Sequence, residues 1–164
     1  MSLEKYHTKR VFNKTPEPKG ENKTSGESKK LIFVVQKHQA SHLHFDFRLE
    51  RDGVLKSWAV PKGPTMDIEI KRLAMEVEDH PIEYAKFHGT IPEGNYGAGK
   101  VEIWDKGTYV PIKTEAGHLE FELKGEKLNG LFALIKIKSF TKGKDNSWLL
   151  FKKRDDYYDD KGDD

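Results

Sequence analysis

The chain of 164 residues contains no cysteine. This absence excludes a disulfide framework, an iron–sulfur cluster, a thiolate zinc site and a cysteine nucleophile. Any metal ion must therefore be held by nitrogen and oxygen ligands. The sequence also lacks an apolar run near the ~20 residues of a membrane helix, and residues 1–30 lack the apolar core of a secretory signal. We therefore expect a cytoplasmic protein with no membrane partner.

An excess of either charge is missing as well. The chain has 29 lysine and arginine residues against 27 aspartate and glutamate residues, which gives a net charge of +2. This balance excludes a histone-like basic coat but leaves room for a local basic cleft. The length predicts one domain that is large enough to bury a core, and we expect a monomer.

The two ends of the chain differ in composition from its middle. Residues 1–30 carry eight lysine and arginine residues against four glutamates, a net charge of +4, and residues 13–30 have no apolar period. They predict a basic N-terminal segment with a linker. Residues 155–164 hold six aspartates and predict an acidic tail. The folded domain is therefore expected at 31–154.

The middle of the chain is dominated by a period of two. From Leu43 to Glu50, apolar and polar residues alternate, which predicts a strand with one buried face. Asp52-Gly53 then predicts a two-residue hairpin turn. Such a turn would place Phe47 opposite Trp58, and Arg48 opposite Ser57.

Further short strands are expected, with glycine, proline and aspartate between them. Their ranges are 73–78, 100–104, 119–124, 131–137 and 147–153. A short turn or helix is expected at 81–87. This pattern predicts a mainly β protein whose antiparallel sheet closes into a barrel or a sandwich.

The polar face of the 43–50 strand carries chemistry. His44, Asp46 and Arg48 share this face, with neighbours roughly 6.5–7 Å apart. Two neutral imidazoles and a carboxylate suit manganese, iron, cobalt or zinc, and His38 ends the preceding strand, where a hairpin would fold it beside His44. His42 has the same parity, and we expect it in the connecting loop, near the site. A merely solvated face is the alternative, although such faces usually select lysine, glutamate and threonine.

Arg48 indicates which kind of ligand the site takes. Its guanidinium group matches the oxygens of a phosphate or carboxylate. Lys62 would add a second cation, and His80 would reach the same phosphate if its strand neighbours the metal strand. The alternative for His80 is a structural histidine at a strand end, held by Pro81.

Several longer motifs resemble a known family. They are residues 33–38, 41–50, 55–64, 77–81 and 89–97, together with Tyr84. In these stretches the chain closely resembles the 3′-phosphoesterase domain of bacterial DNA ligase D, over about residues 6–153. No ligase or polymerase domain adjoins them here, so we expect a free-standing member. The resemblance implies a compact closed barrel of about eight antiparallel strands with short flanking helices.

The resemblance also implies an activity and its residues. Members are manganese-dependent enzymes that heal DNA 3′ ends, with Co²⁺ or other divalent transition metals as substitutes. They remove a 3′-terminal ribonucleoside from a primer–template and then hydrolyse the remaining 3′-phosphate to 3′-OH. The partners implied are such DNA ends and a separate ligase and polymerase of a non-homologous end-joining system. The metal ligands of the family correspond to His38, His44 and Asp46. Its phosphate-binding and catalytic pair corresponds to Arg48 and His80. Its supporting catalytic positions correspond to Lys62, Arg72, Glu78, Tyr84, Arg10 and Glu17.

The N-terminal motif contains one departure from the family. Val11 follows Arg10 where the family usually has aspartate, in a segment on which the diesterase step leans. This difference bears on the balance of diesterase to monoesterase activity. The resemblance further implies that residues 5–17 dock on the active site, which leaves 18–30 as the flexible linker.

Two other functions fit parts of the pattern. His44 and Asp46 with a distant His80 imitate the facial triad of a non-haem iron oxygenase, in which Arg48 would bind an oxo-acid. A non-catalytic module that binds DNA ends is the other alternative.

Overall fold

The computed structural model describes residues 30–92, 98–138 and 146–155. Arg10, Glu17, the expected docking segment 5–17 and nearly all of the expected linker lie outside these ranges, as do residues 156–164 of the acidic tail. The predictions for these segments stay predictions. None of the described helices is long and apolar enough to cross a membrane.

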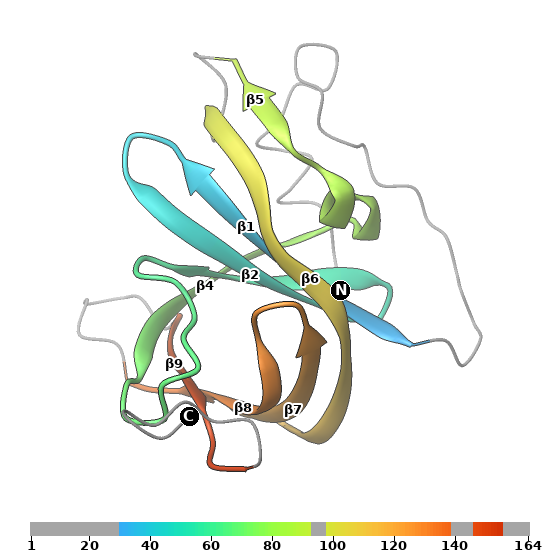
Figure 1. Cartoon of the computed structure of the whole chain (residues 1–164), viewed down its shortest axis with the longest axis vertical. Coiled ribbons are helices and arrows are strands. Elements are labelled where there is room, and N and C mark those ends of the chain that lie inside the picture. The colour runs from blue at the N-terminus through green and yellow to red at the C-terminus, as the bar shows by residue number, and fades with distance from the viewer. Residues whose placement is uncertain (1–29, 93–97, 139–145, 156–164) are drawn as a thin grey trace.

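One antiparallel sheet contains all nine strands of the described residues (Figure 1). Its order is β1-β2-β3-β4-β9-β8-β7-β6-β5, and an additional pairing of β1 with β6 closes eight of these strands into a barrel. The predicted barrel is thereby confirmed. The bounds are β1 Leu31–Gln39, β2 Leu43–Arg51, β3 Val54–Val60, β4 Arg72–His80, β5 Gly89–Ile91, β6 Gly99–Glu115, β7 His118–Gly125, β8 Asn129–Lys136 and β9 Ser147–Lys152.

The predicted hairpin between β2 and β3 is present with the expected register. Phe47 lies opposite Trp58, and Arg48 lies opposite Ser57. Asp52 and Gly53 have φ angles of 56° and 82°, the left-handed conformation that a tight hairpin turn requires. The turn therefore fixes which face each β2 side chain occupies.

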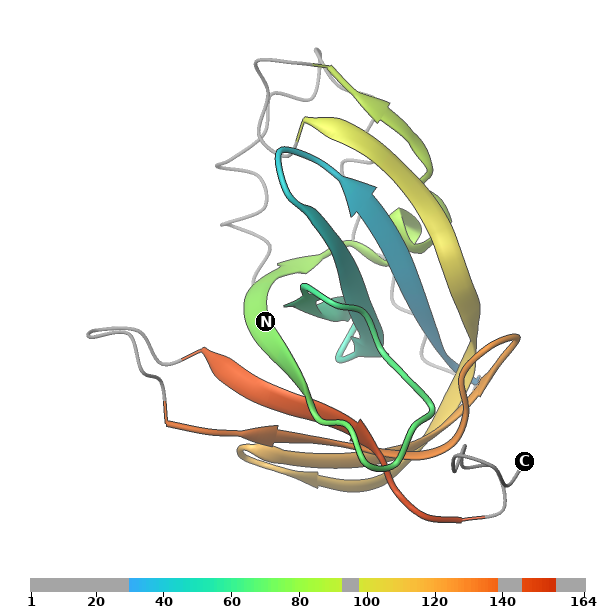
Figure 2. The same cartoon turned by 60° about the vertical axis from the view of Figure 1, so that its left-hand side comes forward.

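The barrel interior holds the main hydrophobic core. Side chains from β1, β2, β3, β7 and β8 meet there, and Figure 2 shows β1 and β2 on one wall with β7–β9 across the floor. Each fully buried side chain of this size contributes about 1.5–3 kcal/mol. The largest members are Phe33, Phe47, Trp58, Phe121 and Phe132.

A second, smaller hydrophobic cluster covers the outer face of β1 and its neighbours. It contains Val34 of β1, Leu55 of β3 and Val101 of β6, packed against Tyr84 and Phe87. Tyr84 belongs to the five-residue 3₁₀ helix η2, Ile82–Lys86, which begins directly after Pro81. This helix matches the expected turn or helix at 81–87, and it is the only helix of the described residues. The outer layer positions the candidate site.

The strand expected at 100–104 is much longer than predicted, since β6 runs from Gly99 to Glu115. Gly107 lies inside it, where a Cβ atom would overlap the carbonyl oxygen of Lys124 in β7. This glycine permits close contact between two strands and does not end one. Because β6 continues past it, one strand pairs with both β1 and β7 and closes the barrel.

Candidate metal and phosphate site

The hairpin between β1 and β2 brings three potential ligands together. Its register pairs His38 with His44, and their ring centroids lie 4.8 Å apart. Asp46 follows two residues later on the same face. Its carboxylate lies 3.2 Å from Nε2 of His44 and 3.6 Å from Nδ1 of His38. The predicted position of His38 beside His44 is confirmed.

The spacing of these atoms fits a shared cation. Two ligand atoms at about 2.0–2.2 Å from one ion are about 2.8–3.6 Å apart at octahedral or tetrahedral angles. The two imidazole–carboxylate distances, 3.2 and 3.6 Å, fall in this range. The ligand atoms of all three residues lie within 4.8 Å of one another, so a small side-chain rotation would bring them onto a single ion. Two imidazoles with one carboxylate suit divalent first-row transition metals, among them manganese, iron, cobalt and zinc. Manganese, which the family resemblance implies, is one of the ions that this donor set accepts.

The electrostatics of the trio keep the carboxylate charged. Burial alone would raise the pKa of Asp46, but the Arg48 charge and hydrogen bonds from His38 and His44 outweigh it. The pKa of Asp46 is therefore held well below its ordinary value. The hydrogen bond to Asp46 raises the pKa of His44, against the lowering effect of burial. A divalent cation requires a charged carboxylate and a neutral imidazole, so the lowered pKa of Asp46 favours its binding and a proton on His44 competes with it.

His42 takes part through its backbone. It lies in the bend between β1 and β2 with an exposed side chain. Its carbonyl oxygen is 3.3 Å from Nδ1 of His44. A proton on Nδ1 would donate to this carbonyl and leave Nε2 free for a metal ion. The geometry thus agrees with the predicted place of His42 beside the ligands.

Arg48 is buried directly behind the trio. Its Nε donates to Gln36 Oε1 at 2.6 Å, and NH1 donates to Ser57 Oγ at 2.8 Å. NH2 lies 3.4 Å from the Asp46 carboxylate. Only 3% of the Arg48 surface is exposed. These partners therefore orient the guanidinium group and replace the hydrogen bonds to water that it loses on burial.

His80 reaches Arg48 from a strand that does not adjoin β2. Its strand, β4, pairs with β3, which lies between β4 and β2. The expected condition, that the strand of His80 neighbours the metal strand, was therefore too strict. His80 Nδ1 lies 3.2 Å from Arg48 NH1, which can donate to it, and 3.0 Å from the carbonyl of Glu78, which can accept from it. The pair expected to bind phosphate is therefore assembled.

Tyr84 forms one wall of the same group. Its ring centroid lies 5.0 Å from the Arg48 guanidinium carbon and 4.8 Å from the His80 ring centroid. The amide of Gln36 donates to the carbonyl oxygens of Tyr84 and Phe87. Gln36 therefore ties the helix that carries Tyr84 to the Arg48 side chain.

A pocket of about 220 Å³ opens over these groups. Most of the expected site residues line it, including Glu78. The lining consists of His38, Ala40, His44, Asp46, Arg48, Ala59, Val77, Glu78, His80, Tyr84 and Ile91.

Comparison with known proteins agrees with this geometry. The sequence profile of the DNA ligase D 3′-phosphoesterase domain matches residues 36–136, well over half of the chain. The chain belongs to this family. The match includes the hairpin, β4 and η2, and thus every residue that lines the pocket.

Relatives of this 3′-phosphoesterase domain are much longer proteins. The multifunctional non-homologous end joining protein LigD of Pseudomonas aeruginosa is 51% identical over 158 residues, which cover 93% of the chain and 19% of that relative. The protein of the same name from Mycolicibacterium smegmatis is 46% identical over 166 residues, covering 93% and 21%. The chain thus spans about a fifth of the length of these relatives.

Two of the expected catalytic residues that the structure describes lie outside the pocket lining of this 3′-phosphoesterase domain. Lys62 is exposed in the turn after β3, and Arg72 begins β4. The Arg72 Nε group donates to the carbonyl of Gly63, the residue after Lys62, at 2.9 Å. Their supporting roles stay predictions.

Two residues of the arrangement were missed by sequence reasoning. Gln36 follows an apolar run, and Ser57 lies in a strand whose other outward positions are apolar. Both side chains bond Arg48. The expected pairing of Arg48 with Ser57 was the available signal for Ser57. For Gln36, the only signal was its position two residues before His38, on the same face of the strand.

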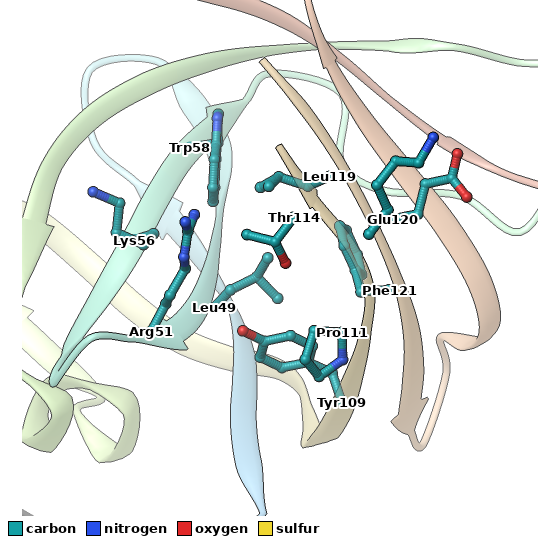
Figure 3. Close-up of a pocket in the computed structure, with 11 residues that line it drawn as sticks. Leu49, Arg51, Lys56, Trp58, Tyr109, Pro111, Thr114, Leu119, Glu120 and Phe121 are labelled. Carbon is teal, nitrogen blue, oxygen red and sulfur yellow. The ribbon is translucent and has the colours of Figure 1, made fainter. Parts of the chain in front are cut away.

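A second hollow lies inside the barrel mouth, between the β2–β3 and β6–β7 hairpins (Figure 3). Its walls include Trp58, Tyr109 and Phe121, and its volume is about 20 Å³. A hollow of this size has room for about one water molecule and is too small for a nucleotide. The pocket over Arg48 is the candidate site.

Proposed function

We propose that this protein is a manganese-dependent phosphoesterase that heals DNA 3′ ends. It removes a 3′-terminal ribonucleoside from a primer–template and then hydrolyses the 3′-phosphate to leave 3′-OH. The observation that carries the proposal is the joint placement of a nitrogen–oxygen ligand trio and a buried Arg48–His80 pair in one pocket.

His38, His44 and Asp46 would hold the manganese ion, and cobalt suits the same ligands. When bound, such an ion supplies positive charge beside a phosphate oxygen and lowers the pKa of a water molecule. Asp46 also faces Arg48 NH2, so the carboxylate that would hold the ion also contacts the guanidinium group. A phosphate bound in the pocket would lie near both positive groups.

Arg48 binds and orients the phosphate. Its position is fixed by Gln36 and Ser57 before any substrate arrives, so little reorganisation is needed when charge builds up on the phosphate oxygens. Tyr84 lies against the guanidinium and keeps one side of it out of water. This preorganisation favours the transition state over the free substrate.

His80 and Tyr84 serve the oxygen that leaves. Each step forms one P–O bond to water and breaks another. The bond to the 5′ oxygen of the departing ribonucleoside breaks in the first step, the bond to the 3′ oxygen of the primer breaks in the second, and in each step the oxygen that leaves must gain a proton. His80 is the proposed source of this proton. Its Nδ1 lies beside the Glu78 carbonyl, which would accept from a protonated Nδ1, and beside Arg48 NH1, which would donate to an unprotonated one. In the proposal, these steps are supported by five further residues: Glu78, Lys62, Arg72, Arg10 and Glu17.

The partners follow from the family and the names of its relatives. Relatives are described as multifunctional non-homologous end joining proteins, which favours DNA ends as the substrate. We therefore propose that primer–template ends with ribonucleotide or phosphate termini bind the pocket. A ligase and a polymerase would act on the healed end.

The iron-oxygenase alternative needs His80 as the third ligand beside His44 and Asp46. Instead, His38 completes the only group of three potential ligands within the described residues, and His80 contacts Arg48. This arrangement favours phosphate chemistry. Oxygen consumption with iron and 2-oxoglutarate would support the alternative.

The proposal is tested by removing single ligands. His44→Ala and Asp46→Ala should each abolish manganese-dependent phosphate release from a primer–template with a 3′-phosphate. Glu120→Gln is the matched control and should retain activity, because Glu120 lies on β7, outside the pocket lining, where it pairs with His118 and Lys153. Near-wild-type release by either ligand variant would contradict the site. Tight binding of DNA ends without product under every divalent metal would favour the non-catalytic module.

A further inference from the structure

We infer that Lys56 and Asp79 are positioning residues that hold an irregular turn of β4 and thereby direct His80 into the pocket. The inference rests on the proposed function, since it concerns the phosphate-binding half of the same site. Neither residue lines the pocket. Both lie behind it, at the junction of β3 and β4.

The register of β3 and β4 shows the irregularity. Ser57 pairs with Val77, whereas Leu55 pairs with His80. One β3 residue, Lys56, therefore faces two β4 residues, Glu78 and Asp79, which is a β-bulge. In a regular ladder Asp79 would lie opposite Leu55, and His80 would turn to the other face of the sheet.

The bulge is what brings His80 to Arg48. Leu55 and Ser57 belong to the face that Arg48 occupies, because Arg48 pairs with Ser57. The extra residue shifts His80 onto this face, where its ring lies 3.2 Å from the guanidinium and 3% of the residue remains exposed. Without the bulge, the pocket would lose one half of its phosphate-binding pair.

An ion pair lies at the bulge itself. The Lys56 ammonium is 3.1 Å from the Asp79 carboxylate, and the two side chains are only 17% and 10% exposed. Figure 3 shows Lys56 beside Arg51 and Trp58, with its ammonium directed away from Leu119 and Phe121. A largely buried carboxylate requires a partner, so Lys56 favours the backbone conformation that presents Asp79 to it.

The metal ligands do not depend on this junction. His38, His44 and Asp46 lie on β1 and β2, whose hairpin register is regular between Phe33 and Leu49. Loss of the ion pair should therefore slow phosphate hydrolysis and leave manganese binding intact. A general loss of stability would not separate these two properties.

The experiment uses Asp79→Asn and Lys56→Met, with Lys56→Arg as the conservative variant. The matched control is Asp155→Asn, which breaks another buried lysine–aspartate pair, Lys152–Asp155, at the end of β9. For each protein, kcat and KM for 3′-phosphate release, the manganese Kd and the Tm are measured. The NMR signal of the Arg48 Nε–H group reports the surroundings of the Arg48–His80 pair.

We expect Asp79→Asn and Lys56→Met to lower kcat about tenfold, because small displacements of a reacting group are costly. The manganese Kd should be unchanged, the Arg48 signal shifted, and at least half of kcat kept by Lys56→Arg. Asp155→Asn should lower the Tm and keep kcat. Wild-type kcat and an unshifted Arg48 signal in both β3–β4 variants would overturn the inference, as would an equal loss of kcat in Asp155→Asn.

Failure of the proposed function would look different. A wild-type protein that releases no phosphate with any metal would contradict that function. The role of Lys56 and Asp79 would then be tested by the Arg48 NMR signal alone. This signal must shift in Asp79→Asn and stay unchanged in Asp155→Asn.

Discussion

Arg48 is the residue at which the two halves of the site meet, because its guanidinium group contacts both Asp46 and His80. The period of two in the sequence places His44, Asp46 and Arg48 on one face, and the structure brings their polar atoms together. Gln36 and Ser57 hold the guanidinium, yet a single-strand pattern gives no account of which neighbours lie beside it. Register, a property of strand pairs, supplies that information.

Replacing Arg48 tests the phosphate half of the site. Arg48→Lys removes the planar fork that bonds Gln36, Ser57 and phosphate, so release of 3′-phosphate should fall by about 100-fold or more. The manganese Kd should stay within about twofold, because all three ligands remain. Steady-state kinetics and manganese titration check both values.

The control for this variant is Arg51→Lys, on the same strand at the hairpin end, where the side chain is 41% exposed. It should retain activity. Equal losses in the Arg48 and Arg51 variants would show that Arg48 has no special role.

The raised pKa of His44 predicts a pH dependence of metal binding. A metal ion needs the neutral imidazole, so protons compete with it. Because the hydrogen bond to Asp46 raises this pKa above 6.5, competition begins above pH 6.5. Manganese affinity should fall about tenfold per pH unit below the pKa of His44. Titrations followed by electron paramagnetic resonance at pH 6, 7 and 8 check this, and a constant affinity across that range would contradict it.

At the scale of elements, the alternating strands were predictable and their irregular points were not. Phe47 and Trp58 face each other as the turn chemistry requires. The bulge at Glu78 and Asp79 depends on the partner strand β3, so the β4 sequence alone does not reveal it. The continuation of β6 past Gly107 was not predictable for the same reason. In a sequence, a glycine that permits close contact between strands cannot be distinguished from one that ends a strand.

Gly99, at the start of β6, predicts a link between strand packing and the site. Its φ is +138°, and a Cβ atom there would overlap the carbonyl oxygen of Gln39, next to His38. Gly99→Ala should therefore push β6 from the end of β1, lower the free energy of unfolding by more than about 2 kcal/mol and weaken manganese binding. Urea unfolding and metal titration measure both effects.

Gly53→Ala is the matched control for this variant. Gly53 also has a positive φ, +82°, but no atom lies within 4 Å of a Cβ built there. It should lose about 1–3 kcal/mol from backbone strain alone and bind manganese normally. A Gly99→Ala protein with wild-type manganese affinity would break the link to His38.

The whole molecule is a barrel with a second apolar layer on one outer wall. Alternation predicted an antiparallel barrel or sandwich, the family resemblance implied the closed barrel, and the structure confirms the barrel. The closing contact, β1 with β6, joins residues some 70 positions apart, such as Phe33 and Gly107. No local pattern encodes such a pairing. The outer layer, built from η2 and its neighbours, forms the wall of the pocket.

Metal binding should stabilise this whole fold. An ion that binds only the folded protein adds about 2.7 kcal/mol at a concentration 100 times its Kd. Manganese should therefore raise the Tm of the wild type and of Glu120→Gln. Thermal unfolding of Asp46→Asn, which lacks one charged ligand, should show no such rise. An equal rise in Asp46→Asn would place the stabilising ion elsewhere.

The central claim is that one pocket heals DNA 3′ ends with manganese. It is tested most directly with a 5′-labelled primer–template that ends in a single ribonucleotide, incubated with manganese, cobalt, magnesium or zinc. We predict that manganese yields a 3′-phosphate product first and a 3′-OH product later, and that neither forms with His44→Ala. An unchanged primer under every metal, or the same products from His44→Ala, would contradict the claim.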